Sequence, residues 1–165
     1  MKTLIEKFMI SLLISDFDGV FTDNSVFVDQ NGKETVRCCR SDGIGIKNLF
    51  SLGLDFFVCT SEKVDCVSHR AEKIGFKAYL NVKNKGQFIT NYLKEKKINA
   101  NNVAYLGNDI NDLSAFEAVG YKIAVKDSYP EVLSMADKIL HKNGGYGAVR
   151  EACQHIIEIN NMNFK

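Results

Sequence analysis

The fold is decided by residues 11–23, which read Ser11-Leu12-Leu13-Ile14-Ser15-Asp16-Phe17-Asp18-Gly19-Val20-Phe21-Thr22-Asp23. The apolar run at residues 11–15 lacks the polar alternation of a half-exposed strand, which predicts a buried parallel strand. Asp16 and Asp18 follow it two residues apart and point the same way if the strand continues through them. Gly19 then allows a sharp turn. The stretch therefore predicts a buried strand that presents two carboxylates at its carboxyl end.

The same arrangement recurs along the chain. Further strands are predicted at residues 54–59, 103–106, 121–125 and 138–140. Helical patterns lie between or after them, at residues 45–52, 63–74, 85–97, 112–119, 128–135 and 148–159. Strands that alternate with helices predict an α/β protein with a Rossmann-like, doubly wound parallel sheet and helices on both faces.

One segment interrupts the alternation. Asn31-Gly32 lies between two runs rich in strand-forming residues, and this pairing is a strong hairpin signal. A β-hairpin over residues 25–38 would be inserted after the first strand, at the carboxyl end where open α/β sheets bind ligands.

Composition limits the classes of protein that remain. A chain of 165 residues suits one domain, here expected to span 1–165, with no second cap domain. The net charge of +1 predicts neither a nucleic-acid nor a membrane partner. The apolar stretch at residues 8–14 is about half a membrane span and lacks a signal-peptide cleavage site. Five cysteines without metal-type spacing predict reduced thiols in a cytoplasmic protein.

Three further loops carry polar chemistry. Thr60-Ser61-Glu62 follows the second strand, where a hydroxyl and the helix start suit an anion. Lys85 precedes a helix and suits a phosphate. Residues 107–113 cluster oxygen-bearing side chains of the kind that bind Mg²⁺. Taken alone, each loop also fits an ordinary explanation: a capped helix start, an acidic turn or a solvated lysine.

Taken together, the order acid pair, hydroxyl, lysine and acid cluster resembles the four motifs of the haloacid dehalogenase superfamily of phosphohydrolases. The hairpin, residues 41–47 and the glycine-rich segment Gly144-Gly145-Tyr146-Gly147 with the helix to residue 160 resemble its capless branch. That branch contains the 3-deoxy-D-manno-octulosonate 8-phosphate phosphatases and the 2-keto-3-deoxynononate or N-acylneuraminate 9-phosphate phosphatases.

The resemblance implies a Mg²⁺-dependent phosphatase. Asp16 would be the nucleophile that forms an aspartyl-phosphate, and Asp18 the general acid and base. Thr60 and Lys85 would bind the phosphoryl oxygens. The metal ligands would come from Asp16, Asp18 through its backbone carbonyl, Asn108, Asp109 and Asp112. Asn108 departs from the family's usual aspartate, so one ligand would carry no charge, and Asp109 or Asp112 could compensate.

Substrate choice would depend on Glu62. Octulosonate phosphatases usually have Thr-Gly-Arg at this place, whereas the nononate-type relatives have glutamate followed by a basic residue, here Lys73 with Arg70 nearby. This pattern favours a nine-carbon sugar acid 9-phosphate, with octulosonate 8-phosphate as the alternative. The expected substrate-binding residues are Asp23, Ser61, Glu62, Arg70 and Lys73.

Without a cap, the branch closes its pocket by assembly, so the resemblance implies a homotetramer. The hairpin and residues 144–150 would form the contacts. Two readings from other classes remain: a receiver-like phospho-acceptor domain and a non-catalytic oligomerisation domain.

Overall fold

The computed structural model describes residues 9–63 and 65–162. Its centre is a six-stranded sheet with the strand order β5-β4-β1-β6-β7-β8, and every pairing in it is parallel. The strands are β1 (Leu12–Ser15), β4 (Asp55–Cys59), β5 (Lys77–Tyr79), β6 (Val103–Gly107), β7 (Tyr121–Ala124) and β8 (Lys138–Ile139). The predicted doubly wound α/β fold is confirmed, and no cap domain occurs among the described residues. Because β1 lies between β4 and β6, the loops after these three strands meet at one edge.

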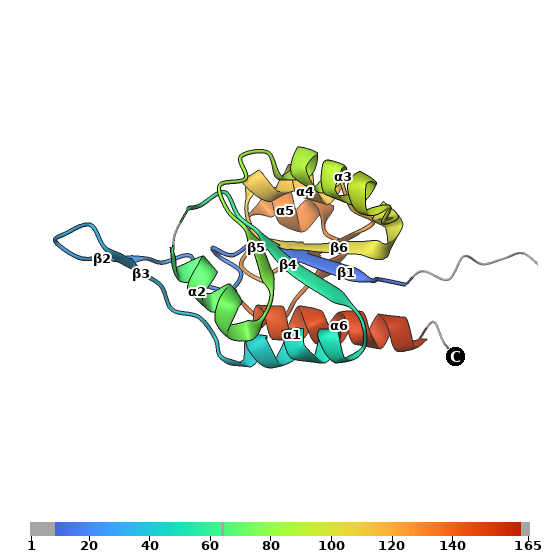
Figure 1. Cartoon of the computed structure of the whole chain (residues 1–165), viewed down its shortest axis with the longest axis horizontal. Helices are drawn as coiled ribbons and strands as arrows, with labels where there is room; N and C mark the ends of the chain where they lie inside the picture. Colours follow the sequence, from blue (N-terminus) through green and yellow to red (C-terminus); the bar gives the residue numbers. More distant parts are fainter. Residues whose placement is uncertain (1–8, 64, 163–165) are drawn as a thin grey trace, which may run out of the picture.

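Helices cover both faces of the sheet (Figure 1). On one face lie α1 (Ser41–Ser51), α2 (Asp65–Ile74) and α6 (Ala148–Met162). On the other lie α3 (Lys85–Lys96), α4 (Leu113–Glu117) and α5 (Pro130–Met135). Two short 3-10 turns, η1 (Ala100–Asn102) and η2 (Ile110–Asp112), precede β6 and α4. Each face has its own buried apolar cluster, because the side chains of the strands alternate between the two faces.

Two elements differ from the expectation. Helix α1 begins at Ser41 rather than at Gly45. Glycine is unfavourable inside a helix, but a Cβ on Gly45 would lie 2.9 Å from the Cα of Arg150, so the glycine permits the close approach of α1 and α6. Strand β5 was not expected, because a three-residue edge strand contains no buried apolar run. Residue 64 of the expected helix 63–74 lies outside the described residues.

The inserted hairpin is present but short. Strands β2 (Phe27–Val28) and β3 (Glu34–Thr35) pair antiparallel and project from the body of the molecule (Figure 1). Its turn is stabilised by the Asp29 carboxylate, which accepts hydrogen bonds from the backbone N–H groups of Asn31 (2.8 Å) and Lys33 (2.9 Å).

Two further expectations concern the whole chain. All five cysteines are free thiols. Within the described ranges, no helix has both the length and the apolar character needed to cross a membrane.

Candidate active site

A pocket of about 350 Å³ opens at the carboxyl ends of β1, β4 and β6. Seven of the predicted site residues line it together, namely Asp16, Asp18, Thr60, Ser61, Glu62, Asn108 and Asp109. They come from three loops that lie far apart in the sequence. The parallel pairing of the three strands brings these loops to one place.

Asp16 is held rigidly at the end of β1. Its backbone N–H donates to the carbonyl oxygen of Leu106 (2.9 Å), and its Oδ1 accepts a hydrogen bond from the Phe17 N–H (2.7 Å). The Phe17 ring is buried and stacks on Phe21 with 5.2 Å between ring centroids. Apolar packing thus anchors the loop that carries the two carboxylates, and it fixes where the Asp16 oxygens lie.

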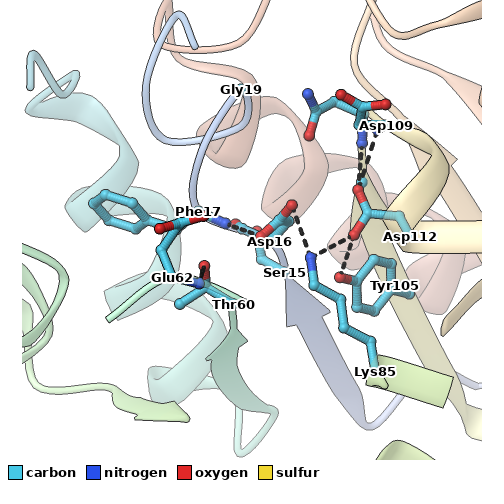
Figure 2. Close-up of polar contacts among 12 residues, drawn as sticks. Ser15, Asp16, Phe17, Gly19, Thr60, Glu62, Lys85, Tyr105, Asp109 and Asp112 are labelled. Atoms are coloured by element: carbon cyan, nitrogen blue, oxygen red, sulfur yellow. Dashed lines mark hydrogen bonds and ion pairs between the residues drawn. The ribbon is translucent and has the colours of Figure 1, made fainter. Parts of the chain in front are cut away.

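Lys85, the first residue of α3, bridges two carboxylates (Figure 2). Its Nζ lies 2.8 Å from Asp16 Oδ2 and 2.8 Å from Asp112 Oδ1, and the lysine is only 1% exposed. Burial lowers the pKa of Lys85, but the two carboxylates outweigh this effect and raise it. The ammonium group therefore stays charged beside Asp16.

The two aspartates of the first loop are more easily protonated than ordinary carboxyl groups. Burial, followed by repulsion from Asp112, raises the pKa of Asp16 to about 7, although Lys85 opposes this. Burial also raises the pKa of Asp18, and Glu62 and Glu34 add to the rise by repulsion. A carboxyl group with a raised pKa can carry a proton close to neutral pH, as a general acid must.

Asp112 supports the site from behind. It is fully buried and does not line the pocket. Its Oδ1 accepts hydrogen bonds from Lys85 and from the Tyr105 hydroxyl (2.7 Å), and its Oδ2 accepts from the N–H groups of Asn108 (2.8 Å) and Asp109 (3.2 Å). These four bonds occupy both oxygens, so Asp112 orients Lys85 and the loop after β6. Tyr105 was missed by sequence reasoning, although a tyrosine in a buried strand needs a polar partner.

Asn108 carries a buried oxygen that lacks a partner. The residue is 5% exposed, and among the described residues its Oδ1 makes no hydrogen bond. The amide packs against Gly19, whose φ of +77° and lack of a Cβ make room for it. An orphaned oxygen in the same pocket as Asp16 and Asp18 suits a hard cation. The described residues contain no group of three or more His, Cys, Asp or Glu side chains placed to hold a metal. The candidate ligands are therefore the Asp16 carboxylate, the Asp18 backbone carbonyl and the Asn108 amide oxygen.

Three predicted substrate residues lie outside this pocket lining. The Asp23 carboxylate pairs with Arg37 at 3.2 Å, and the Arg70 guanidinium donates to the carbonyl oxygen of Cys39 at 3.1 Å. Lys73 is exposed in the last turn of α2. Sequence reasoning missed several residues that do line the pocket, among them Asn24, Ser25, Glu34 and Asn111. The predicted hairpin supplies Ser25 and Glu34, and its place at the carboxyl end of the first strand could have indicated that they line the pocket.

Comparisons with known proteins agree with this geometry. The family model described as haloacid dehalogenase-like hydrolase matches residues 76–152. The 3-deoxy-D-manno-octulosonate 8-phosphate phosphatase of Salmonella typhi is 34% identical over 149 residues, which are 90% of this chain and 79% of that protein.

Two solved structures show the same fold. The cobalt-bound deoxy-D-mannose-octulosonate 8-phosphate phosphatase from Haemophilus influenzae is 30% identical and superposes with a TM-score of 0.88, covering 95% of this chain and 92% of that one. The Moraxella catarrhalis 3-deoxy-D-manno-octulosonate 8-phosphate phosphatase, in complex with magnesium ion, phosphate ion and a KDO molecule, is 28% identical. Its TM-score is 0.89, with coverage of 96% and 91%.

Proposed function

The chain belongs to the haloacid dehalogenase superfamily, in the branch of the 3-deoxy-D-manno-octulosonate 8-phosphate phosphatases, and on this premise we propose that it is a Mg²⁺-dependent phosphatase of a 2-keto-3-deoxy sugar acid phosphate. The observation that carries the proposal is the buried Lys85, which holds Asp16 in place at the wall of the pocket. A phosphatase accounts for this arrangement better than a receiver-like or non-catalytic domain does, because Asp18, two residues after Asp16, can act as the general acid and base.

The reaction takes place in two displacements at phosphorus. In the first, an Asp16 oxygen bonds to phosphorus while the bond between phosphorus and the sugar oxygen breaks. Asp18 gives its proton to the departing sugar oxygen. In the second, Asp18 takes a proton from a water molecule whose oxygen attacks phosphorus, and the Asp16–phosphorus bond breaks to release inorganic phosphate. Asp16 and Asp18 then have their original protonation states.

The remaining residues bind charge during these steps. Lys85 donates to Asp16 and lies close enough to counter the negative charge that a phosphoryl group brings. Thr60 is buried in the pocket wall, and its hydroxyl accepts a hydrogen bond from the Glu62 N–H (3.2 Å), which leaves the hydroxyl proton free for a phosphoryl oxygen.

The Asp16 carboxylate, the backbone carbonyl oxygen of Asp18 and the amide oxygen of Asn108 would hold the metal ion. Bound there, Mg²⁺ would offset the repulsion between the Asp16 carboxylate and the phosphate. The cobalt and magnesium ions in the two related structures support a divalent metal ion as the cofactor. Asp109 is a weaker candidate, because its Oδ1 accepts a hydrogen bond from the Ile110 N–H.

Asn108→Asp should tighten Mg²⁺ binding. The change replaces a neutral oxygen by a charged one, and hard-cation affinity rises with ligand charge, so we expect a dissociation constant about tenfold lower. Isothermal titration calorimetry with the substrate-free protein measures this directly. Asn111→Asp adds the same charge to the pocket lining at a residue outside the proposed ligand set, and it should have a smaller effect. Equal effects of the two variants would contradict a direct ligand role for Asn108.

The comparisons support the eight-carbon substrate over the nine-carbon one that Glu62 suggests. The Salmonella, Haemophilus and Moraxella relatives are all named for octulosonate 8-phosphate. The observation that favours the nine-carbon acid is the Glu62 carboxylate in the pocket wall, which repels a substrate carboxylate. We propose octulosonate 8-phosphate as the first substrate to test, with the nononate 9-phosphate as the second.

The test is Mg²⁺-dependent phosphate release from both sugar acids, with Glu62→Arg alongside the wild type. An arginine can pair with the substrate carboxylate, so the ratio of kcat/KM for the eight-carbon over the nine-carbon acid should rise about tenfold. An unchanged ratio would mean that Glu62 does not select the substrate. Release from neither acid would refute the proposed function.

We also propose that the chain assembles as a homotetramer through its hairpins. Phe27 and Val28 are exposed, with Phe27 at 69%, and apolar side chains gathered on a projecting hairpin favour burial against another copy. The glycine-rich segment contacts its own chain, since the Gly145 N–H donates to the carbonyl oxygen of Val20 (3.0 Å). An active monomer in light scattering would refute the tetramer.

A further inference from the structure

The pocket wall contributed by the hairpin carries one charged side chain, Glu34. The register of the hairpin places Val28 opposite Glu34 and Phe27 opposite Thr35. Because side chains alternate along a strand, Val26, Glu34 and Val36 share one face, and that face lines the pocket. Phe27 and Thr35 occupy the other face. The hairpin thus presents a carboxylate beside two valines to the pocket and an aromatic ring away from it.

Among the described residues, no basic side chain pairs with this carboxylate. Glu34 is exposed, and in that part of the chain its side chain makes neither a hydrogen bond nor an ion pair, although Lys33 is its neighbour in sequence. The described residues that line the pocket include no lysine, arginine or histidine. A free carboxylate on a pocket wall without basic side chains is available to a ligand.

Glu34 lines the same pocket as Asp18, the proposed acid, and Glu62. Asp18 protonates the leaving oxygen in the proposed mechanism. The part of the substrate that remains attached to that oxygen therefore lies in the pocket that Glu62 and Glu34 line.

The carboxylates of Glu34 and Glu62 determine which substrate groups can lie beside them. An ionised carboxylate only accepts hydrogen bonds, and it repels an anion. Hydroxyl groups donate to such acceptors, whereas a carboxylate cannot. This end of the pocket therefore suits the hydroxyl-bearing chain of a sugar phosphate, with any acidic end of the substrate directed elsewhere.

We propose that Glu34 is a specificity-determining residue that accepts hydrogen bonds from substrate hydroxyl groups next to the phosphate. The inference rests on the proposed phosphatase activity and adds to it a role for the hairpin in recognition. One face of the hairpin binds substrate, and the opposite face, with Phe27, remains available for assembly.

The test compares substrates with and without hydroxyl groups. Glu34→Gln and Glu34→Ala are assayed on octulosonate 8-phosphate, on the neutral polyol phosphate sorbitol 6-phosphate and on p-nitrophenyl phosphate. We expect both variants to raise KM about tenfold for octulosonate 8-phosphate or sorbitol 6-phosphate, whichever the wild type hydrolyses with the higher kcat/KM. This is the loss typical of a hydrogen bond to a charged group. With p-nitrophenyl phosphate, which has no hydroxyl on its leaving group, KM should stay within about twofold of the wild type.

Two controls separate recognition from disturbance of the fold. Lys33→Gln changes the neighbouring hairpin residue outside the pocket lining, and Glu131→Gln removes a carboxylate from α5. Neither should change any KM. The inference is overturned if the Glu34 variants leave the KM for sugar phosphates unchanged or raise it equally for p-nitrophenyl phosphate. It also fails if the wild type does not prefer sorbitol 6-phosphate to p-nitrophenyl phosphate. Failure of the wild type on octulosonate 8-phosphate alone refutes the proposed substrate and leaves the Glu34 test in place.

Discussion

Asp16→Asn is expected to reduce phosphate release by on the order of 10⁵-fold while leaving the protein folded. The amide has nearly the shape of the carboxylate but is not a nucleophile, so the bond to phosphorus cannot form. Lys85 keeps its contact with Asp112 in the variant, because that pair does not involve Asp16. The measurement is steady-state phosphate release with Mg²⁺, together with circular dichroism of the variant.

Asp23→Asn is the matched control for this prediction. Asp23 belongs to the same loop, but its carboxylate pairs with Arg37 outside the pocket lining. We expect the control to retain activity. Rapid quenching of the wild type should also trap a phosphoenzyme that hydroxylamine cleaves, and Asp16→Asn should show none. Repeated turnover in the asparagine variant would refute Asp16 as the nucleophile.

Asp16→Asn should also change how the free energy of unfolding depends on pH. In the metal-free protein the pKa of Asp16 is raised from its ordinary value of 3.8 to about 7, so the folded state binds this proton more tightly than the unfolded state. The free energy of unfolding therefore falls as pH rises through this range. Asp16→Asn should flatten that decline in urea unfolding curves recorded with a chelator. If the free energy of unfolding fell equally with pH in the wild type and in Asp16→Asn, the group with the raised pKa would not be Asp16.

Lys85→Met is expected to lose both activity and stability. The side chains are similar in length, but the variant leaves Asp16 and Asp112 buried without their shared cation. Removing one partner from a buried charge group destabilises a protein by about 3–5 kcal/mol. Loss of the cation beside the nucleophile should lower kcat by about 10³-fold, as when a preorganised donor to the transition state is removed.

A double variant separates the two effects of Lys85. Lys85→Met with Asp112→Asn removes one of the two stranded charges, so most of the lost unfolding free energy should return. Activity should not return, because Asp16 still lacks its cation. Lys83→Met changes an exposed lysine just before α3 and should alter neither quantity. If the double variant were as unstable as Lys85→Met, the destabilisation would not arise from the paired carboxylates.

Much of the fold could be predicted from the sequence because it depends on local patterns. The continuous apolar run before Asp16 is typical of a buried parallel strand, and the helices between strands have apolar stripes. Strand β5 and the start of α1 were exceptions. An edge strand lacks a buried run, and Gly45 of α1 is explained only by the closeness of Arg150 in α6.

The candidate site divides in the same way. The sequence by itself determined which loops carry the chemistry, because parallel strands align their carboxyl ends and so bring Asp16, Thr60 and Asn108 to one pocket. Only the tertiary structure decided that Asp112 lies behind the pocket with Lys85 and Tyr105, that Arg70 donates to the Cys39 carbonyl, and that Glu34 faces the pocket. The physical reason is that a residue's position in the sequence fixes which end of which strand carries it. Its partners depend on burial and on contacts between segments that are distant in sequence, such as Lys85 and Asp16.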